Sequence, residues 1–113
     1  MEAPLPEPVD GGHLERITHR DPQLQNELLA LFHDHVPGEL SRLRGAGPDE
    51  RSEIAHRLCG SAKAIGAWEV ARVAAELEAT REGVEATTAE LAAAVAEVQR
   101  YIEGRLSAAP PPG

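Results

Sequence analysis

Apolar residues recur along this chain at the spacing of helices, and no stretch alternates apolar and polar residues as a half-buried strand does. The longest stripe consists of Leu24, Leu28, Leu31, Phe32, Val36, Leu40 and Leu43. It keeps its phase across Pro37, where the missing N–H removes one helical hydrogen bond. We therefore expect one helix over about 22–44 that is kinked at Pro37 rather than divided there.

Three further apolar stripes predict three more helices, separated by short turns that contain glycine. The second helix spans about 48–65, the third about 67–81 and the fourth about 88–105. A capping-box pattern, Thr87 followed by Glu90, marks the expected start of the last helix. Because the turns are short, consecutive helices are expected to pack antiparallel.

The chain is therefore expected to be all-α, with an antiparallel four-helix bundle as its architecture. A short extra helix is expected across one end, because the segment 13–19 has only two apolar anchors. We divide the chain into a flexible lead at 1–12, a helical bundle at 13–106 and a disordered tail at 107–113. The lead combines prolines, acids and glycines, which bury little apolar surface.

The second helix carries the candidate chemistry, in the stretch IAHRLCGSAKAIGAW. At about 100° of turn per residue, the face expected to point inward holds Ile54, Leu58, Ser61, Ala62 and Ile65. The opposite face holds His56, Gly60 and Lys63, so His56 is expected to face solvent. Glycine inside a helix costs about 1 kcal/mol relative to alanine. The gap that Gly60 leaves beside the imidazole would let another protein's surface approach the ring.

The segment HRLCGSAKAIGA, residues 56–67, resembles the signature of histidine-containing phosphotransfer (HPt) domains. In that signature a histidine is followed by an apolar residue and then, in most members, by a lysine. Gly-Ser-Ala or Gly-Ser-Ser comes next, and a Gly-Ala or similar pair follows later. The resemblance covers the chain from about Leu14 to Leu106. It implies that His56 accepts a phosphoryl group from an aspartate of one receiver domain and passes it to an aspartate of another.

The same resemblance implies the partners of such a carrier. These are response-regulator receiver domains and a hybrid sensor histidine kinase, with Mg²⁺ on the partner receiver and no cofactor on this chain. A phosphocarrier of this kind is not itself a kinase. An imidazole is a nucleophile near neutral pH, and phosphoryl transfer depends mostly on positioning and charge stabilisation.

Two further positions bear on that role. The lysine usually found three residues after the histidine is Cys59 here, so Lys63 is the candidate to balance the phosphoryl charge; a plain surface cation is the alternative. Helical side chains lean toward the N-terminus, which lets the Lys63 ammonium lean toward His56. Related HPt domains often place a glutamine against the phosphorylated imidazole, and Glu78 falls where that glutamine would be. Its carboxylate would hold Nδ1–H and leave Nε2 to attack; a plain solvated glutamate is the alternative.

Composition narrows the classes of function. At 113 residues the chain suits one domain, and its net charge of −8 argues against general nucleic-acid binding. A single cysteine allows no internal disulfide and fits a reducing compartment. No run approaches the ~20 apolar residues of a membrane span, and the N-terminus lacks the pattern of a secretory signal. We expect a cytoplasmic monomer with no nucleic-acid or membrane partner.

The main alternative is a non-catalytic helical adaptor that docks a partner through the small-residue face around Gly60. The dimeric bundle of a sensor kinase would also need an ATP-binding domain, for which we expect no room in this chain. His56 and Cys59 would be only half of a metal site, because no second pair converges on them. A Cys–His nucleophilic enzyme is equally disfavoured, because nothing marks an oxyanion hole.

Overall fold

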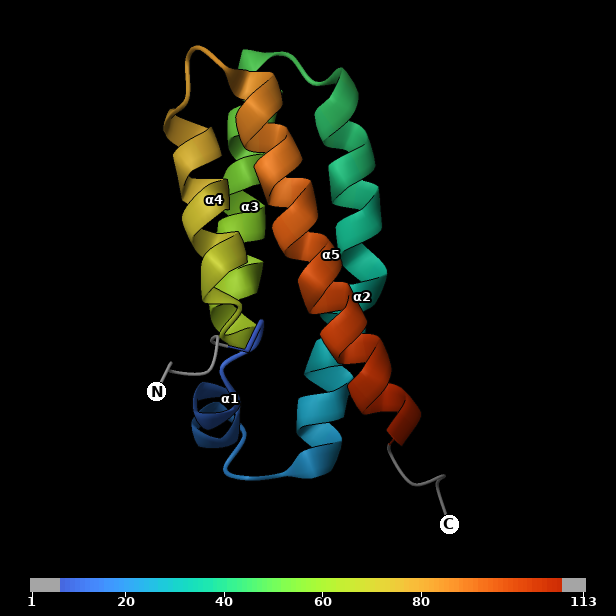
Figure 1. Cartoon of the computed structure of the whole chain (residues 1–113). Helices are drawn as coiled ribbons and strands as arrows, with labels where there is room; N and C mark the ends of the chain where they lie inside the picture. Colours follow the sequence, from blue (N-terminus) through green and yellow to red (C-terminus); the bar gives the residue numbers. More distant parts are fainter. Residues whose placement is uncertain (1–6, 109–113) are drawn as a thin grey trace, which may run out of the picture.

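The computed structural model describes residues 7–108, which form five helices and, within that range, no strand. The helices are α1 (Gly11–Ile17), α2 (Pro22–Gly45), α3 (Pro48–Ile65), α4 (Trp68–Ala79) and α5 (Val84–Ala108) (Figure 1). The all-helical prediction is confirmed. None of the described helices is long and apolar enough to cross a membrane.

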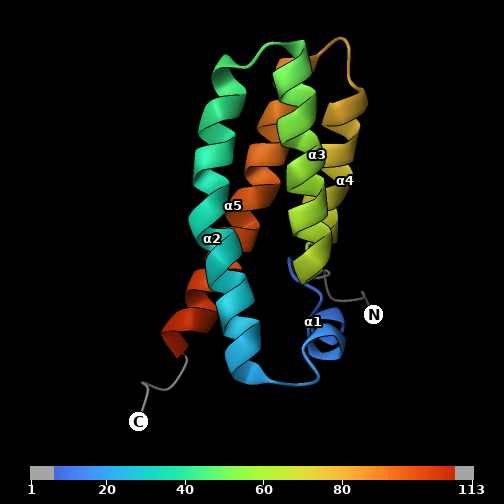
Figure 2. The same cartoon turned by 180° about the vertical axis from the view of Figure 1, so that it is seen from behind.

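The four longer helices lie side by side, and each runs opposite to the one before it (Figures 1 and 2). Helix α3 packs against α2 and α4, and α5 packs against the same two helices from the other side. The contact between α3 and α4 is the most extensive. Helix α1 lies beyond the end at which α3 passes into α4 (Figure 2).

Helix α2 begins where the sequence indicates. The Asp21 carboxylate accepts hydrogen bonds from the N–H groups of Gln23 and Leu24, and Pro22 occupies the first turn, where no N–H is needed. The helix continues unbroken through Pro37, so the prediction of one helix rather than two is confirmed.

The buried face of α2 differs from the predicted stripe. Leu24 and Leu31 are exposed, whereas Gln25 and Glu39 are buried among the apolar residues. Gln25 is satisfied by other helices, because its amide donates to the Thr18 hydroxyl over 3.1 Å and its oxygen accepts from Arg105 of α5. Polar partners at Thr18, the C-cap of α1, and on α5 therefore allow the Gln25 amide to be buried.

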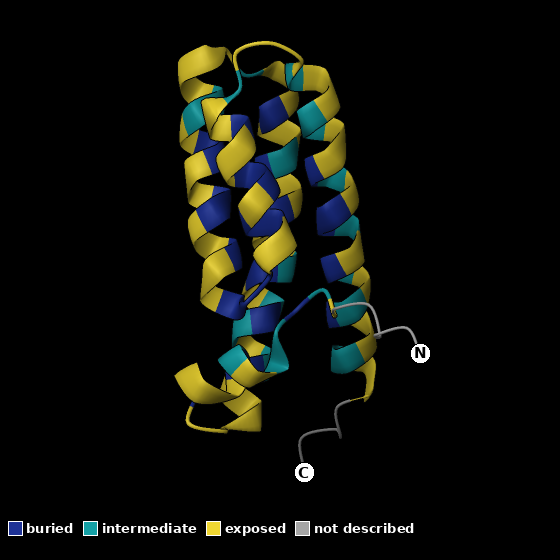
Figure 3. Ribbon diagram, turned by 60° about the vertical axis from the view of Figure 1, so that its left-hand side comes forward, coloured by how far each residue is buried: buried dark blue, intermediate teal, exposed yellow. Residues whose placement is uncertain are grey.

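The core is built from aliphatic side chains on the inner faces of the helices (Figure 3). The largest fully buried side chains are Leu14, Leu29, Ile54, Leu58, Leu77, Leu91 and Ile102. Phe32 is the aromatic residue in the buried core. Since the sequence has only one phenylalanine, one tryptophan and one tyrosine, the core depends on leucine, isoleucine, valine and alanine.

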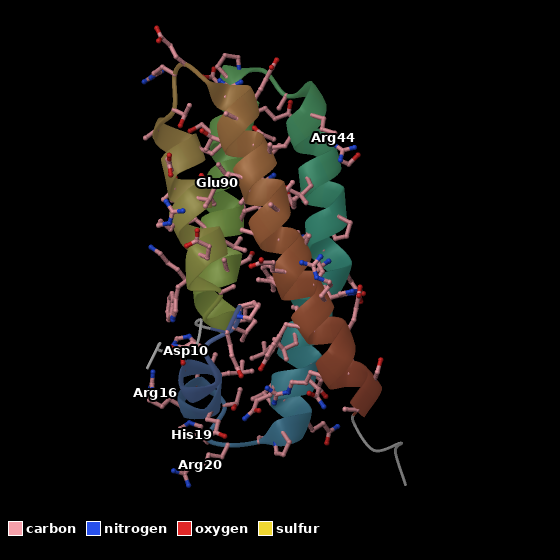
Figure 4. The ribbon with its side chains drawn as sticks, viewed as in Figure 1. Asp10, Arg16, His19, Arg20, Arg44 and Glu90 are labelled. Atoms are coloured by element: carbon pink, nitrogen blue, oxygen red, sulfur yellow. The ribbon has the colours of Figure 1, made fainter. Side chains whose placement is uncertain are left out.

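The prediction of a flexible lead at 1–12 is wrong for residues 9–12. Val9 is fully buried, and the Asp10 N–H donates to the carbonyl of Gly66 over 2.9 Å. The Asp10 carboxylate caps α1 through the His13 N–H and accepts from the Trp68 indole N–H over 2.9 Å. These hydrogen bonds, the one from Trp68 foremost, lower the pKa of Asp10. Residues 9–12 are thus part of the fold, with Asp10 at the junction of α1 and α4 (Figure 4); residues 1–6 lie outside the described range.

The predicted start of the last helix is wrong by four residues. Helix α5 begins at Val84, and Thr87 and Thr88 lie inside its first turns rather than at its cap. The hydroxyl of Thr88 donates back to the Val84 carbonyl over 2.7 Å, which the capping-box geometry does not include. Gly83, with φ of +69°, makes the turn into α5. At the other end the helix reaches Ala108, so residues 107 and 108, which were predicted to belong to the tail, are helical. Residues 109–113 lie outside the described range.

Charged side chains join neighbouring helices across the surface. On α4, Arg72 pairs with Glu69 and Glu76, and its guanidinium lies 3.6 Å from Glu90 of α5, which projects toward α4 (Figure 4). On the opposite side of α5, Glu103 lies 2.8 Å from His33 Nε2 of α2. The hydrogen bond to Glu103 raises the pKa of His33, partly opposed by burial. Gln99 adds a bond to the His33 carbonyl over 3.0 Å.

We expect the His33–Glu103 pair to stabilise the protein more at pH 6 than at pH 8. The pKa of His33 is raised in the folded state, so its contribution is complete below the unfolded value of about 6.5 and is lost as pH rises through the folded value. Glu103→Gln should therefore lower the free energy of unfolding by up to about 1 kcal/mol at pH 6, and by less at pH 8. Urea unfolding at both pH values measures this. If Glu103→Gln causes the same loss in a His33→Gln background, the pairing does not act through the imidazolium.

Candidate functional site

His56 projects from the middle of α3 into solvent. Its side chain is 77% exposed, while Ile54 and Leu58 on the same helix are buried. The prediction that His56 faces solvent is confirmed. An imidazole in this position is accessible to another protein, and helix α3 fixes its backbone.

Glu78 of α4 lies against the His56 ring. Its carboxylate is 3.3 Å from His56 Nδ1. A carboxylate can only accept a hydrogen bond, so the contact requires the proton to be on Nδ1. In that tautomer the lone pair of Nε2 is free and directed away from Glu78.

A shallow depression surrounds the imidazole on the α3 and α4 side. It is lined by Asp49, Ser52, Glu53, His56, Arg57 and Glu78. Three carboxylates and one guanidinium thus lie around the ring. Any group bearing negative charge on His56 would meet carboxylates on several sides and one arginine.

Gly60 and Lys63 lie on the exposed side of α3, as predicted. Beyond its two chain neighbours and the backbone of its own helix, a Cβ atom built on Gly60 would meet no heavy atom within 4 Å, so the surface beside the imidazole is open. Lys63 begins two helical turns beyond His56, about 10 Å along the axis. The lysine and the glycine therefore share the face of the imidazole, but only the glycine is its immediate neighbour on the helix.

Ser61 is placed differently from the prediction. Ser61, expected on the inward face, is exposed, and Cys59 is buried in the core. The reason is that α3 packs more extensively on α4 than on α2, which turns the buried arc toward Ala55 and Cys59 and leaves Ser61 at its margin. Cys59 consequently contributes packing beneath the site, and its thiol does not share the open surface of His56.

Sequence reasoning missed an ion pair beside the site. Arg57 donates to Glu39 Oε2 over 3.2 Å, and Arg42 donates to Glu39 Oε1 over 3.3 Å. The Glu39 side chain is only 7% exposed. The sequence does indicate that Glu39 is buried, because its spacing from Val36 and Leu43 is that of a core residue of α2. A carboxylate at such a position requires a cation from a neighbouring helix.

An apolar groove lies beside this pair, between α2 and α3. It has a volume of about 280 Å³ and is lined mainly by Leu28, Leu31, Phe32, Val36, Leu58 and Ile65, with Ser61 and Arg57 at its edges. Leu31 is 65% exposed there. Within residues 7–108, no three histidine, cysteine or acidic side chains come together as a metal site would require.

Comparison with protein families gives one finding. A family model described as Hpt domain matches residues 27–107, which is most of the chain and includes α3 and α4. No curated protein and no solved structure matches the chain significantly.

We expect Glu78→Ala to shift the His56 ring away from the Nδ1–H tautomer. Loss of a hydrogen bond at this exposure changes the tautomer ratio by about two- to fivefold, because such a contact contributes up to about 1 kcal/mol. The ¹⁵N chemical shifts of the His56 ring nitrogens measure the ratio. Glu53→Ala is the matched control, since it removes a carboxylate from the same depression but has no hydrogen bond to the ring. Equal shifts in the two variants would mean that Glu78 acts only through its charge.

Proposed function

We propose that this chain, which belongs to the Hpt domain family, receives a phosphoryl group on His56 from the aspartate of one receiver domain and passes it to the aspartate of another. Histidine phosphotransfer in phosphorelays is the general role of Hpt domains, and they are phosphocarriers rather than kinases. The observation that carries the assignment to His56 is its exposed imidazole, with Nδ1 against Glu78 and Nε2 free.

The chemistry follows from that tautomer. The Nε2 lone pair of His56 attacks phosphorus in line, a P–Nε2 bond forms, and the P–O bond to the aspartate breaks, leaving a carboxylate. The ring then carries a positive charge, with its proton still on Nδ1, and the Glu78 carboxylate stabilises it. In the return step the ring leaves as neutral imidazole with the same proton. Mg²⁺ held by the partner receiver would supply further charge stabilisation.

Gly60 and Ser61 supply access. A receiver must bring its aspartate close to Nε2, and a large side chain at Gly60 would occupy the space above the neighbouring turn of α3. The open surroundings of Gly60 support this role. Ser61 borders the apolar groove on the α2 side, where a docked partner would continue over the surface.

Lys63 supplies positive charge near His56. Many Hpt domains have a lysine for this purpose at the position that Cys59 occupies here. Phosphorylation adds about two negative charges to a depression that already holds three carboxylates. Lys63 acts across about two turns of helix, comparable to the Debye length of about 8 Å at physiological salt, so its contribution is small. Cys59 lies in the core and supplies no cation.

The partners proposed are the receiver domain of a hybrid sensor histidine kinase and that of a response regulator, meeting this chain in the cytoplasm. The chain would act as a monomer, with the four-helix bundle of α2–α5 as a rigid support and α1 closing one end. Its net charge of −8 speaks against nucleic acid as a partner.

A non-catalytic adaptor is the second candidate, and the apolar groove with the exposed Leu31 favours it. An adaptor would bind its partner through this surface and use no chemistry at His56. The two functions therefore differ in what His56 contributes.

Incubation with a phosphorylated receiver domain should label His56 with a phosphoryl group that is acid-labile and stable to alkali. The label is mapped by mass spectrometry, and His56→Gln should abolish it while receiver binding persists. Binding without any label on the unsubstituted protein, across a panel of phosphorylated receivers, would favour the adaptor.

Gly60→Gln should make the protein more stable but a slower phosphoryl carrier. Glutamine has the higher helix propensity, which adds about 0.5 kcal/mol to the free energy of unfolding. Gly104→Gln is the matched control, because Gly104 is also a helical glycine with nothing within 4 Å of its Cβ position, on α5. Both variants should gain stability in urea unfolding, and only Gly60→Gln should slow transfer several-fold. Equal transfer rates would refute the access argument.

A further inference from the structure

Arg57 lies at the boundary between the two surfaces of α3. It follows His56 in the chain and lines both the depression around the imidazole and the apolar groove on the α2 side. Its guanidinium is half exposed and is bonded to Glu39 of α2. Among the described residues that line the His56 depression, Arg57 is the only arginine or lysine.

We infer that Arg57 exchanges partners when His56 is phosphorylated: its guanidinium breaks its bond to Glu39 and binds the phosphoryl oxygens. This inference rests on the proposed function of His56 and adds to it a residue that binds the transferred group. It also gives the ion pair between α2 and α3 two states, which depend on the phosphorylation of α3.

The Glu39 carboxylate can release Arg57 because it has a second cation. Arg42 bonds to Oε1, while Arg57 bonds to Oε2, and His35 Nε2 lies 3.9 Å from Oε1. A buried carboxylate left without any cation would be strongly destabilising. With Arg42 still in place on the same helix, the exchange leaves Glu39 paired.

The phosphoryl group is the stronger partner for a guanidinium. It carries about two negative charges and three acceptor oxygens, and arginine binds such groups with two parallel hydrogen bonds. Arg57 begins one residue from His56, whereas Lys63 begins seven residues away. Asp49, Glu53 and Glu78 surround the same position, so a phosphoryl group there has a strong requirement for a nearby cation.

The test uses chemical phosphorylation, which needs no partner protein. Phosphoramidate transfers its phosphoryl group to an imidazole: the P–Nε2 bond forms, the original P–N bond breaks, and ammonia leaves. Urea unfolding at pH 8 is compared before and after treatment, with occupancy of His56 determined by mass spectrometry. Phosphoramidate can also modify other histidines, so the shift in the urea midpoint that treatment causes in His56→Gln is measured and subtracted from the shift of each protein.

Phosphorylation should lower the urea midpoint of the unsubstituted protein, and the variants should change that shift in opposite directions. Arg57→Gln should enlarge it about twofold, because a charge-assisted bond to the phosphoryl group is lost. Glu39→Gln should reduce it, because Arg57 is then released in advance. The shift in Arg57→Lys should be larger than in the unsubstituted protein and smaller than in Arg57→Gln. Lys63→Gln should enlarge the shift by less than Arg57→Gln. Arg100→Gln, which removes the same charge from an exposed position on α5, should leave the shift nearly unchanged.

A purely structural ion pair gives a different result. In that case Arg57→Gln and Glu39→Gln each lower the midpoint of the unphosphorylated protein, and the further shift on phosphorylation is equal in all variants. That outcome would overturn the inference while leaving His56 as the phosphoryl carrier. The expected order of shifts, combined with no exchange with any receiver, would support Arg57 and refute the proposed relay. Failure of both phosphoramidate and receivers to modify His56 would overturn both.

Discussion

The turn at Gly66 is the constraint on which the site depends. Gly66 ends α3 with φ of +77°, a conformation that side chains disfavour, and a Cβ atom there would lie 3.0 Å from the Cβ of Asp10. The turn reverses the chain so that α4 returns along α3. Because His56 lies ten residues before Gly66 and Glu78 twelve after it, the two residues come level on adjacent helices. The tautomer of the imidazole is thus a consequence of a backbone turn about 15 Å away along α3.

The same turn anchors the N-terminal segment. The Gly66 carbonyl accepts from the Asp10 N–H, Trp68 donates to the Asp10 carboxylate, and the His13 ring lies edge-on to Trp68 with centroids 4.9 Å apart. Val9 fills the space beneath. Helix α1 is therefore bonded to the α3–α4 turn at its start, and Thr18 at its end is bonded to Gln25 of α2. This leaves the surface around His56 uncovered.

Two carboxylates near the site have opposite environments. Glu78 is partly solvated and meets an imidazole, whereas Glu39 is buried and takes one arginine on each oxygen. Solvent screens the first contact, so its main effect is to orient a proton. The second cannot lose both cations without leaving a buried charge unpaired. The site thus combines a weak contact that orients a proton with a buried carboxylate that must keep at least one cation.

The sequence by itself determined the helices, their order, the aliphatic core and the exposure of His56. These features depend on the spacing of residues three and four apart, which a helix converts directly into faces. Prediction from the sequence was wrong on the burial of Ser61, on Thr87 as a helix cap and on residues 9–12 as part of a flexible lead. These features depend on which neighbouring element packs against a residue at the edge of a buried face, or accepts its hydrogen bond.

Only the tertiary structure decided that Glu78 contacts Nδ1, that Arg57 pairs with Glu39 and that Asp10 meets Trp68. These partners are 22, 18 and 58 residues apart. Periodicity along one helix indicates which face is buried, but not the axial level or rotation at which a second helix packs against it. Side-chain packing across the whole interface sets those two quantities, and it therefore determines the chemistry at His56.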